Sequence, residues 1–161
     1  MDSIDKEELR QAIIERLERE LSTLVGAANS AREEATDSDS RQEGKFDMRS
    51  QLAAYMAAGQ AKLAEELRAA ILAYRQLTLD ADSTGSSVTA GSLVALDSPA
   101  GRSWYFVGPA RGGMDVEVGG TVITVVTPGS PIGRALVDRR VGEHVVLAGA
   151  HSPLGIVGAV A

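Results

Sequence analysis

The feature that most constrains this fold is a pair of apolar stripes, spaced by three and four residues, in the first half of the chain. One stripe runs from Leu9 to Ala35 and the other from Met48 to Leu77. Steps of three and four place side chains on one face of a helix, at the a and d positions of a coiled coil. Residues 36–44 between the stripes contain no apolar side chain. The pattern therefore predicts two amphipathic helices joined by a polar turn.

The two helices are expected at about residues 5–36 and 42–78, packed as an antiparallel coiled coil. At about 1.5 Å per residue, an arm of about 30 residues reaches roughly 45 Å. The first stripe changes from leucine to alanine toward the turn, which predicts a thin distal end. A coil that serves only dimerisation has the same pattern and stays open as an alternative. The residues expected in the seam are Leu17, Leu21, Leu24, Leu52, Leu63 and Leu67.

The second half of the chain has a different composition and predicts a β domain. Residues 1–80 carry 16 acidic and 11 basic side chains, whereas residues 81–161 carry 6 and 5 and are rich in glycine. Runs of β-branched and aromatic residues bounded by Gly, Pro, Asp or Ser are typical of strands. These runs lie at 93–96, 102–107, 121–126, 143–147 and 154–160.

One short helix interrupts these strands after Thr127. Ser130 is suited to an N-cap and Pro131 to the first helical turn, while Arg139 and Arg140 would favour the negative end of the helix dipole. A helix laid on a small antiparallel sheet makes an α+β domain. The fold class expected for the whole chain is therefore α+β, with the helical hairpin preceding the sheet.

Several classes of protein are excluded by composition. The net charge of −6 argues against a protein that holds DNA through a basic face of its own. The chain has no cysteine and only two histidines, which excludes disulfides, thiolate zinc sites and a His-rich metal site. The N-terminus is charged from Asp2 and does not have the pattern of a signal peptide, and the apolar runs are far shorter than the roughly 20 residues of a bilayer span. A cytoplasmic protein is expected.

Two segments of the second half resemble a known family. Trp104–Gly108 and residues 125–136, following a helical hairpin with a polar tip, resemble the bacterial Gre transcription elongation factors. Residues 130–136, Ser-Pro-Ile-Gly-Arg-Ala-Leu, are the most specific match, and Ala-Arg-Glu at 31–33 is a weaker one. The resemblance implies a coiled-coil hairpin at 1–79, a linker at 80–90 and an FKBP-like domain at 91–161.

The resemblance also implies a partner and a mechanism. Gre factors dock the C-terminal domain at the rim of the secondary channel of RNA polymerase and insert the coiled coil into it. Carboxylates at the tip then help to hold a second Mg²⁺, jointly with the polymerase, which hydrolyses its own backtracked RNA. Such a factor is not itself an enzyme, takes no small-molecule substrate and meets nucleic acid only through the polymerase. The docking residues implied here are Ser130, Pro131, Ile132, Gly133 and Arg134.

The tip departs from the family pattern, in which the metal-binding Asp and Glu lie three residues apart. Aligning Phe46 with the family's tyrosine places Asp39 on the Asp but Gln42 on the Glu. Aligning Glu43 with the Glu leaves Ser40 at the Asp position. A neutral amide oxygen attracts a dication far less than a carboxylate does. Neither alignment preserves the pair.

The clustered candidates for catalysis at the tip are Asp37, Asp39 and Glu43, and those for Mg²⁺ are Asp39 and Glu43. The same residues have a structural interpretation, because Ser40 and Glu43 form the pattern of a capping box for the second helix. Magnesium binding and helix capping both stay open from the sequence.

Three other functions are compatible with the sequence. A non-cleaving Gre-like paralogue would regulate polymerase by occupying its channel. A peptidyl-prolyl isomerase is suggested only by analogy with the FKBP-like fold. A coiled-coil adaptor without polymerase docking would need no motif at 130–136.

Overall fold

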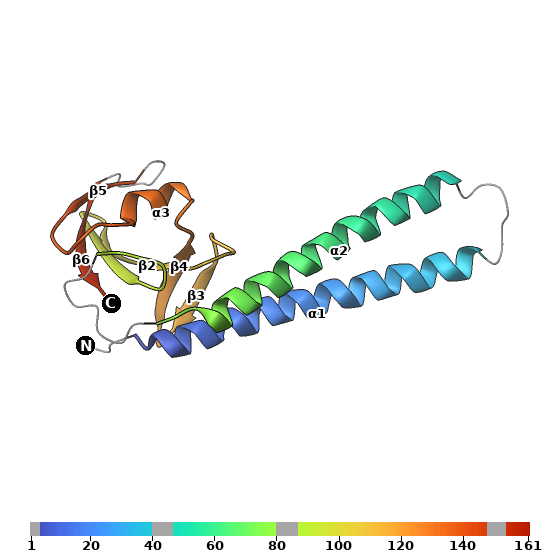
Figure 1. The fold of residues 1–161 in the computed structure, drawn as a ribbon, viewed down its shortest axis with the longest axis horizontal. Helices are drawn as coiled ribbons and strands as arrows, with labels where there is room; N and C mark the ends of the chain where they lie inside the picture. The colour runs from blue at the N-terminus through green and yellow to red at the C-terminus, as the bar shows by residue number, and fades with distance from the viewer. Residues whose placement is uncertain (1–3, 40–46, 80–86, 148–153) are drawn as a thin grey trace. The chain divides into compact units, whose positions relative to one another are not determined.

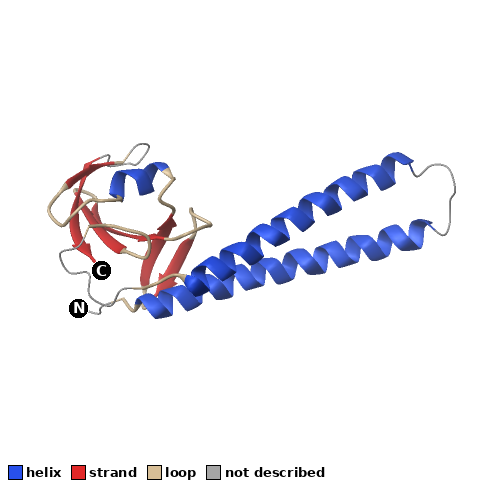
Figure 2. Cartoon of the chain, in the orientation of Figure 1, coloured by secondary structure: helices blue, strands red, loops and turns tan. Residues whose placement is uncertain are grey.

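A computed structural model describes residues 4–39, 47–79, 87–147 and 154–161. Two long helices come first, α1 (Lys6–Asp39) and α2 (Asp47–Gln76), followed by six strands and one short helix (Figure 1). The chain divides into two compact units, one made of residues 1–14 with 73–161 and the other of residues 15–72. The expected order of a helical hairpin and then a sheet with one short helix is confirmed (Figure 2). The boundaries expected at 79/80 and 90/91 stay predictions.

The sheet has the strand order β3-β4-β2-β1-β6-β5. All neighbouring pairs are antiparallel except β2 and β4, which run parallel. The predicted antiparallel sheet is thus confirmed, with one parallel pair that the sequence did not indicate. The strands are β1 (Leu93–Ser98), β2 (Gly101–Val107), β3 (Asp115–Val118), β4 (Thr121–Val126), β5 (His144–Val146) and β6 (Leu154–Val160).

The strand that the sequence did not predict, β3, explains the parallel pair. Its four residues alternate between acidic and valine side chains, and only the valines are buried. The chain then turns back through Gly119 and Gly120, both at positive φ, into β4. Because β3 lies between β2 and β4 in the chain, this reversal makes β4 run in the same direction as β2.

One face of the sheet is covered by α3 (Pro131–Leu136). The core on this side consists of valines and leucines of alternate strand positions, because successive side chains of a strand point to opposite faces. Leu136 is fully buried in this core, and Ile132 and Ala135 pack against it. The short helix is thus fixed to the sheet along its whole length.

The first turns of α1 and the end of α2 belong to the same compact unit as the sheet. The Lys6 ammonium donates to the Gly91 carbonyl at 3.1 Å. The Arg10 guanidinium donates to the Leu77 carbonyl just beyond α2, where the last carbonyls of a helix lack partners. These bonds tie both helix ends to this unit.

Tyr74, near the end of α2, is fully buried and contacts the loop after β2. Its hydroxyl donates to the Ala110 carbonyl at 2.6 Å, and burial raises the pKa of the Tyr74 hydroxyl well above its ordinary value. A Cβ on Gly108 would overlap the Tyr74 hydroxyl oxygen and lie 3.0 Å from the ring carbon that carries it. Glycine at 108 is therefore required by the tyrosine rather than by a turn.

We expect Gly108→Ala to lower the free energy of unfolding by about 2 kcal/mol, because the added methyl group overfills a packed site. Tyr74→Phe should cost about 1 kcal/mol through the lost hydrogen bond. The double variant should cost less than the sum, because phenylalanine removes the oxygen that the new methyl group meets. Urea unfolding of the four proteins gives the coupling energy, expected at about 1 kcal/mol. Strictly additive losses would contradict the contact.

The unit of residues 15–72 contains the greater part of the two helices, and both are unbroken. The predicted seam is confirmed at Leu17 and Leu67, which are buried, and Leu21 and Leu24 are half-buried. It is wrong for Leu52 and Leu63, which are 60% and 38% exposed. Within this unit, α1 and α2 separate toward residues 39 and 47 (Figure 1). Alanine buries little apolar area, so an alanine-rich helix gives the distal leucines little to pack against.

Candidate functional site

The predicted docking segment begins at a capped helix end. The Ser130 hydroxyl donates to the Thr127 carbonyl at 2.7 Å and accepts from the Gly133 amide at 3.0 Å. Pro131 occupies the first helical position, where a missing N–H leaves no bond unmade. The capping role expected for these two residues is confirmed. They set where the chain leaves β4 and enters α3.

Gly133 is buried, and its backbone lies against residue 127. A Cβ at this position would overlap the Thr127 carbonyl oxygen and its carbon, and would lie 2.9 Å from the Ser130 hydroxyl oxygen. No side chain fits there without moving backbone. Ser130, Gly133 and Leu136 therefore have structural roles that explain much of the motif without any partner.

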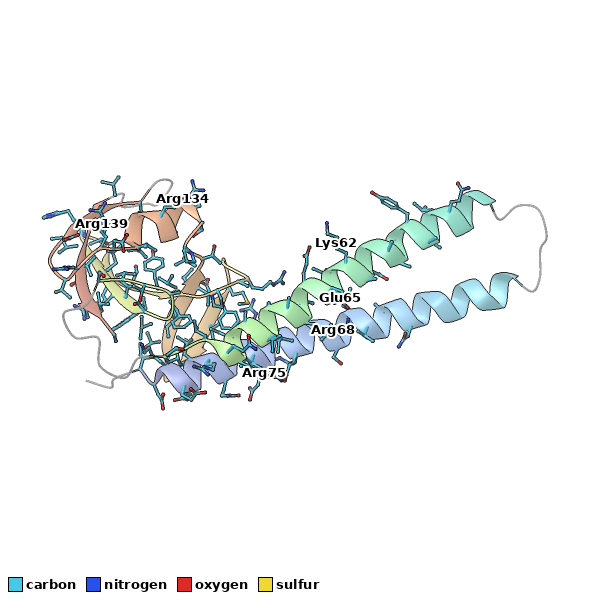
Figure 3. All side chains as sticks on the ribbon, viewed as in Figure 1. Lys62, Glu65, Arg68, Arg75, Arg134 and Arg139 are labelled. Atoms are coloured by element: carbon cyan, nitrogen blue, oxygen red, sulfur yellow. The ribbon has the colours of Figure 1, made fainter. Side chains whose placement is uncertain are left out.

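Two of the five predicted docking residues, Pro131 and Arg134, are exposed, while Ile132 packs partly against the core. Within the part of the chain that the structure describes, the Arg134 guanidinium has no ion pair or hydrogen bond. Figure 3 shows Arg134 projecting from α3. An unpaired, exposed guanidinium on a fixed helix is suited to bind a carboxylate of a partner.

A second arginine pair follows α3. The helix ends at Leu136, so Arg139 and Arg140 lie beyond it, and the expected interaction with its C-terminal end is made by Arg139. Arg139 donates to the Ala135 carbonyl at 3.2 Å and lies 3.8 Å from the Glu143 carboxylate. The Arg140 side chain is exposed. The sequence signal for this basic group is the presence of three arginines within residues 134–140. From the sequence, two of them were assigned to the end of the helix and were not considered as a surface.

A separate charged cluster lies on β1 and β2. The Arg102 guanidinium binds both Asp97 carboxylate oxygens, at 2.6 and 2.9 Å, and lies 5.9 Å from the centre of the Trp104 ring. The hydrogen bond from Arg102 lowers the pKa of Asp97, and the same bond raises the pKa of Arg102. Each charge is already matched by the other, so this cluster is less suited than Arg134 to bind an external ion.

The tip residues lie at the far end of the hairpin unit. Asp37 and Asp39 fall in the last turn of α1, three residues beyond the end expected for this helix, and Glu43 lies outside the described residues. No basic residue stands in this last turn, which is the negative end of the helix dipole. The predicted Ser40–Glu43 capping box also lies outside the described residues.

The residues expected to hold Mg²⁺ are Asp39, the last residue of α1, and Glu43, which lies outside the described residues. The pair Asp39 and Glu43 stays a prediction.

Two further observations concern the described ranges alone. They contain no group of three or more His, Asp or Glu side chains placed to hold a metal ion. None of their helices is both long and apolar enough to cross a bilayer.

Comparisons with known proteins add structural likeness only. No family model matches the sequence, and no curated protein matches it. Among solved structures, Thermus aquaticus Gfh1 is 22% identical over 93% of this chain and 94% of its own, with a TM-score of 0.39. The GreA factor homolog 1 (Gfh1) protein of Thermus thermophilus is 19% identical over 92% of this chain and 94% of its own, also with a TM-score of 0.39.

Proposed function

We propose that this protein is a transcription factor of the Gre type that binds RNA polymerase through the surface around α3 and places its helical hairpin in the secondary channel. The resemblance of residues 130–136 to the Gre factors supports this proposal. So does the order of elements, a hairpin of long helices followed by a sheet domain.

The observation that carries the proposal is Arg134, which is exposed and has no partner among the residues that the structure describes. Ser130, Gly133 and Leu136 are explained by the cap, the close backbone approach and the core. Nothing within the sheet domain explains an arginine at 134, which is therefore the position of the motif with the strongest claim to a partner.

Binding to purified RNA polymerase tests the proposal directly. The full chain, immobilised on a resin, should retain the core enzyme at low salt and release it as salt rises, because exposed charge pairs are screened. A folded chain that fails to retain polymerase at low salt would refute the proposal. Pure adaptor or prolyl isomerase function would then be the remaining interpretations.

Neither alignment of the tip preserves an Asp and a Glu three residues apart, and this departure favours a factor that occupies the channel without stimulating cleavage. We expect the wild-type chain to leave the rate of transcript cleavage in backtracked complexes unchanged over a range of Mg²⁺, although it binds them. The double variant Asp39→Asn/Glu43→Gln should bind polymerase as wild type does, because the proposed docking residues lie in the other unit.

Stimulated cleavage by the wild type would contradict this expectation. If it occurs, the double variant should abolish it, since each carboxylate would act on charge in a two-metal transition state. A capping role alone should cost about 1 kcal/mol of stability and leave cleavage unaffected.

A further inference from the structure

A buried tyrosine that is not part of the proposed docking surface lies in the last turn of α2. Tyr74 is fully buried and belongs to the same compact unit as the sheet. Its hydroxyl donates to the Ala110 carbonyl at 2.6 Å, and its ring lies against Gly108. A buried hydroxyl without a partner is costly, so the tyrosine and the loop that holds this carbonyl depend on each other. Tyr74 thus fixes residues 108–113, here called the β2–β3 loop.

The β2–β3 loop lies against the end of β4. At its start, the Gly108 amide donates to the Val126 carbonyl at 2.8 Å. Further along, a Cβ on Gly112 would lie 3.2 Å from the Thr127 amide nitrogen and 3.3 Å from the Thr127 Cγ2. No space for a methyl group therefore separates the loop from Thr127, the residue that follows β4.

Thr127 in turn determines where α3 begins. Its carbonyl oxygen accepts from the Ser130 amide at 3.0 Å and from the Ser130 hydroxyl at 2.7 Å. The Gly133 backbone lies so close to the same carbonyl that a Cβ there would overlap it. The Arg134 amide then donates to the Ser130 carbonyl at 2.8 Å. A displacement of Thr127 therefore moves the first turn of α3 as well.

We propose that Tyr74 is a positioning residue for α3, acting through the β2–β3 loop and Thr127. The bond to Ala110 holds the loop against Thr127, and Thr127 holds the capped helix that presents Arg134. Contiguous packed groups and hydrogen bonds are a physical means by which one position affects another. The link to polymerase binding rests on the proposed function, whereas the positioning of α3 is a property of the isolated chain.

The competing interpretation is that Tyr74 only packs the end of α2 against the sheet. Loss of such a contact lowers the free energy of global unfolding, which affects all the most protected amides alike. Loss of a positioning contact instead increases the local opening of α3. Amide hydrogen exchange, followed residue by residue by nuclear magnetic resonance, distinguishes the two roles.

The exchange of α3 can be compared with that of the centre of the sheet. The Gly133 amide donates to the Ser130 hydroxyl at 3.0 Å, and the Val137 amide donates to the Gly133 carbonyl at 2.9 Å. These two amides report on α3. The reference is the ladder of β1 and β2 where Leu96 pairs with Ser103, toward the end of β2 away from the β2–β3 loop.

Tyr74→Phe should raise the exchange rates of the Gly133 and Val137 amides at least threefold relative to the reference. The physical reason is that the Ala110 carbonyl loses its hydrogen bond while the aromatic ring stays in place. The matched control is Tyr55→Phe, which removes a hydroxyl from a side chain of the same helix that is 79% exposed. The control should leave the ratio unchanged. Equal increases in α3 and in the reference for Tyr74→Phe would overturn the proposal.

A second pair of variants tests the step at Thr127. Gly112→Ala places a methyl group against the Thr127 backbone and should also raise exchange in α3 at least threefold relative to the reference. Gly129→Ala is much nearer to α3 in the sequence, but its Cβ meets nothing within 4 Å, so exchange should change less than twofold. A larger effect at 129 than at 112 would refute transmission through the loop.

Polymerase binding separates this proposal from the proposed function. If α3 is the docking surface, Tyr74→Phe should weaken binding of purified RNA polymerase at least twofold. A wild-type chain that fails to retain polymerase would refute the proposed function, while faster exchange in α3 of Tyr74→Phe would still support positioning. Binding by the wild type together with unchanged α3 exchange in Tyr74→Phe would overturn positioning and leave the proposed function standing.

Discussion

Replacing Gly133 with alanine is expected to lower the free energy of unfolding of the sheet domain by about 3 kcal/mol or more. The new methyl group overlaps the Thr127 carbonyl oxygen and its carbon, which are backbone atoms and cannot rotate away as a side chain can. Relief requires moving the turn before α3, which breaks the Ser130 cap and withdraws Leu136 from the core. Urea unfolding followed by fluorescence measures the effect, because Trp104 on β2 is the only tryptophan in the chain.

The matched control is Gly129→Ala, four residues earlier. A Cβ on Gly129 meets nothing within 4 Å, and its φ is not in the left-handed region, so this change should alter stability by less than about 0.5 kcal/mol. Equal unfolding midpoints for the two variants would show that α3 can shift without cost. The conclusion that the Thr127 backbone requires glycine at position 133 would then be wrong.

Reversing the charge of Arg134 is expected to weaken polymerase binding at least tenfold, or about 1.4 kcal/mol. Arg134→Glu turns an attraction for a partner carboxylate into a repulsion. We expect the association rate constant to change more than the lifetime of the complex. The fold should be unaffected, because the Arg134 side chain is exposed and makes no hydrogen bond or ion pair with the residues that the structure describes. Surface plasmon resonance at two salt concentrations measures the loss.

Neutralisation provides a matched comparison for this effect. Arg134→Gln should reproduce part of the loss, whereas Arg139→Gln should change affinity less than twofold, because Arg139 is already engaged by Glu143 and the Ala135 carbonyl. Equal losses for both would indicate a general charge effect rather than a specific contact at 134. Unchanged affinity for folded Arg134→Glu would show that the segment is only structural.

The parts of the fold that local sequence patterns encode were predictable. Helical spacing gave both long helices, and the Ser-Pro pair gave the capped start of α3. The strand β3 was missed because four residues with two acidic side chains resemble a loop. The end of α3 at Leu136 was missed because the arginines that follow it resemble a favourable helix end.

Other features depend on contacts that no local pattern contains. The heptad spacing correctly identified which faces of α1 and α2 are apolar, but not how much area they bury on one another. The pairing of Tyr74 with Gly108 joins residues far apart in the chain, and glycine at 108 has no turn signature that would reveal it. At the site, the sequence named the docking segment but could not separate Arg134 from the residues that only build the helix.

The strand order also sets the sequence of events by which this sheet assembles. It consists of three local hairpins, β1–β2, β3–β4 and β5–β6, each closed by a short connection. Two further pairings join them: the parallel β2–β4 pair, and the β1–β6 pair between distant segments, in which Val94 meets Val160. Local hairpins form in microseconds, whereas closing a long loop costs conformational entropy before the stabilising contacts between its ends have formed. Docking of the third hairpin onto β1 is therefore expected to limit the folding rate, and substitutions along that junction should slow folding more than they speed unfolding.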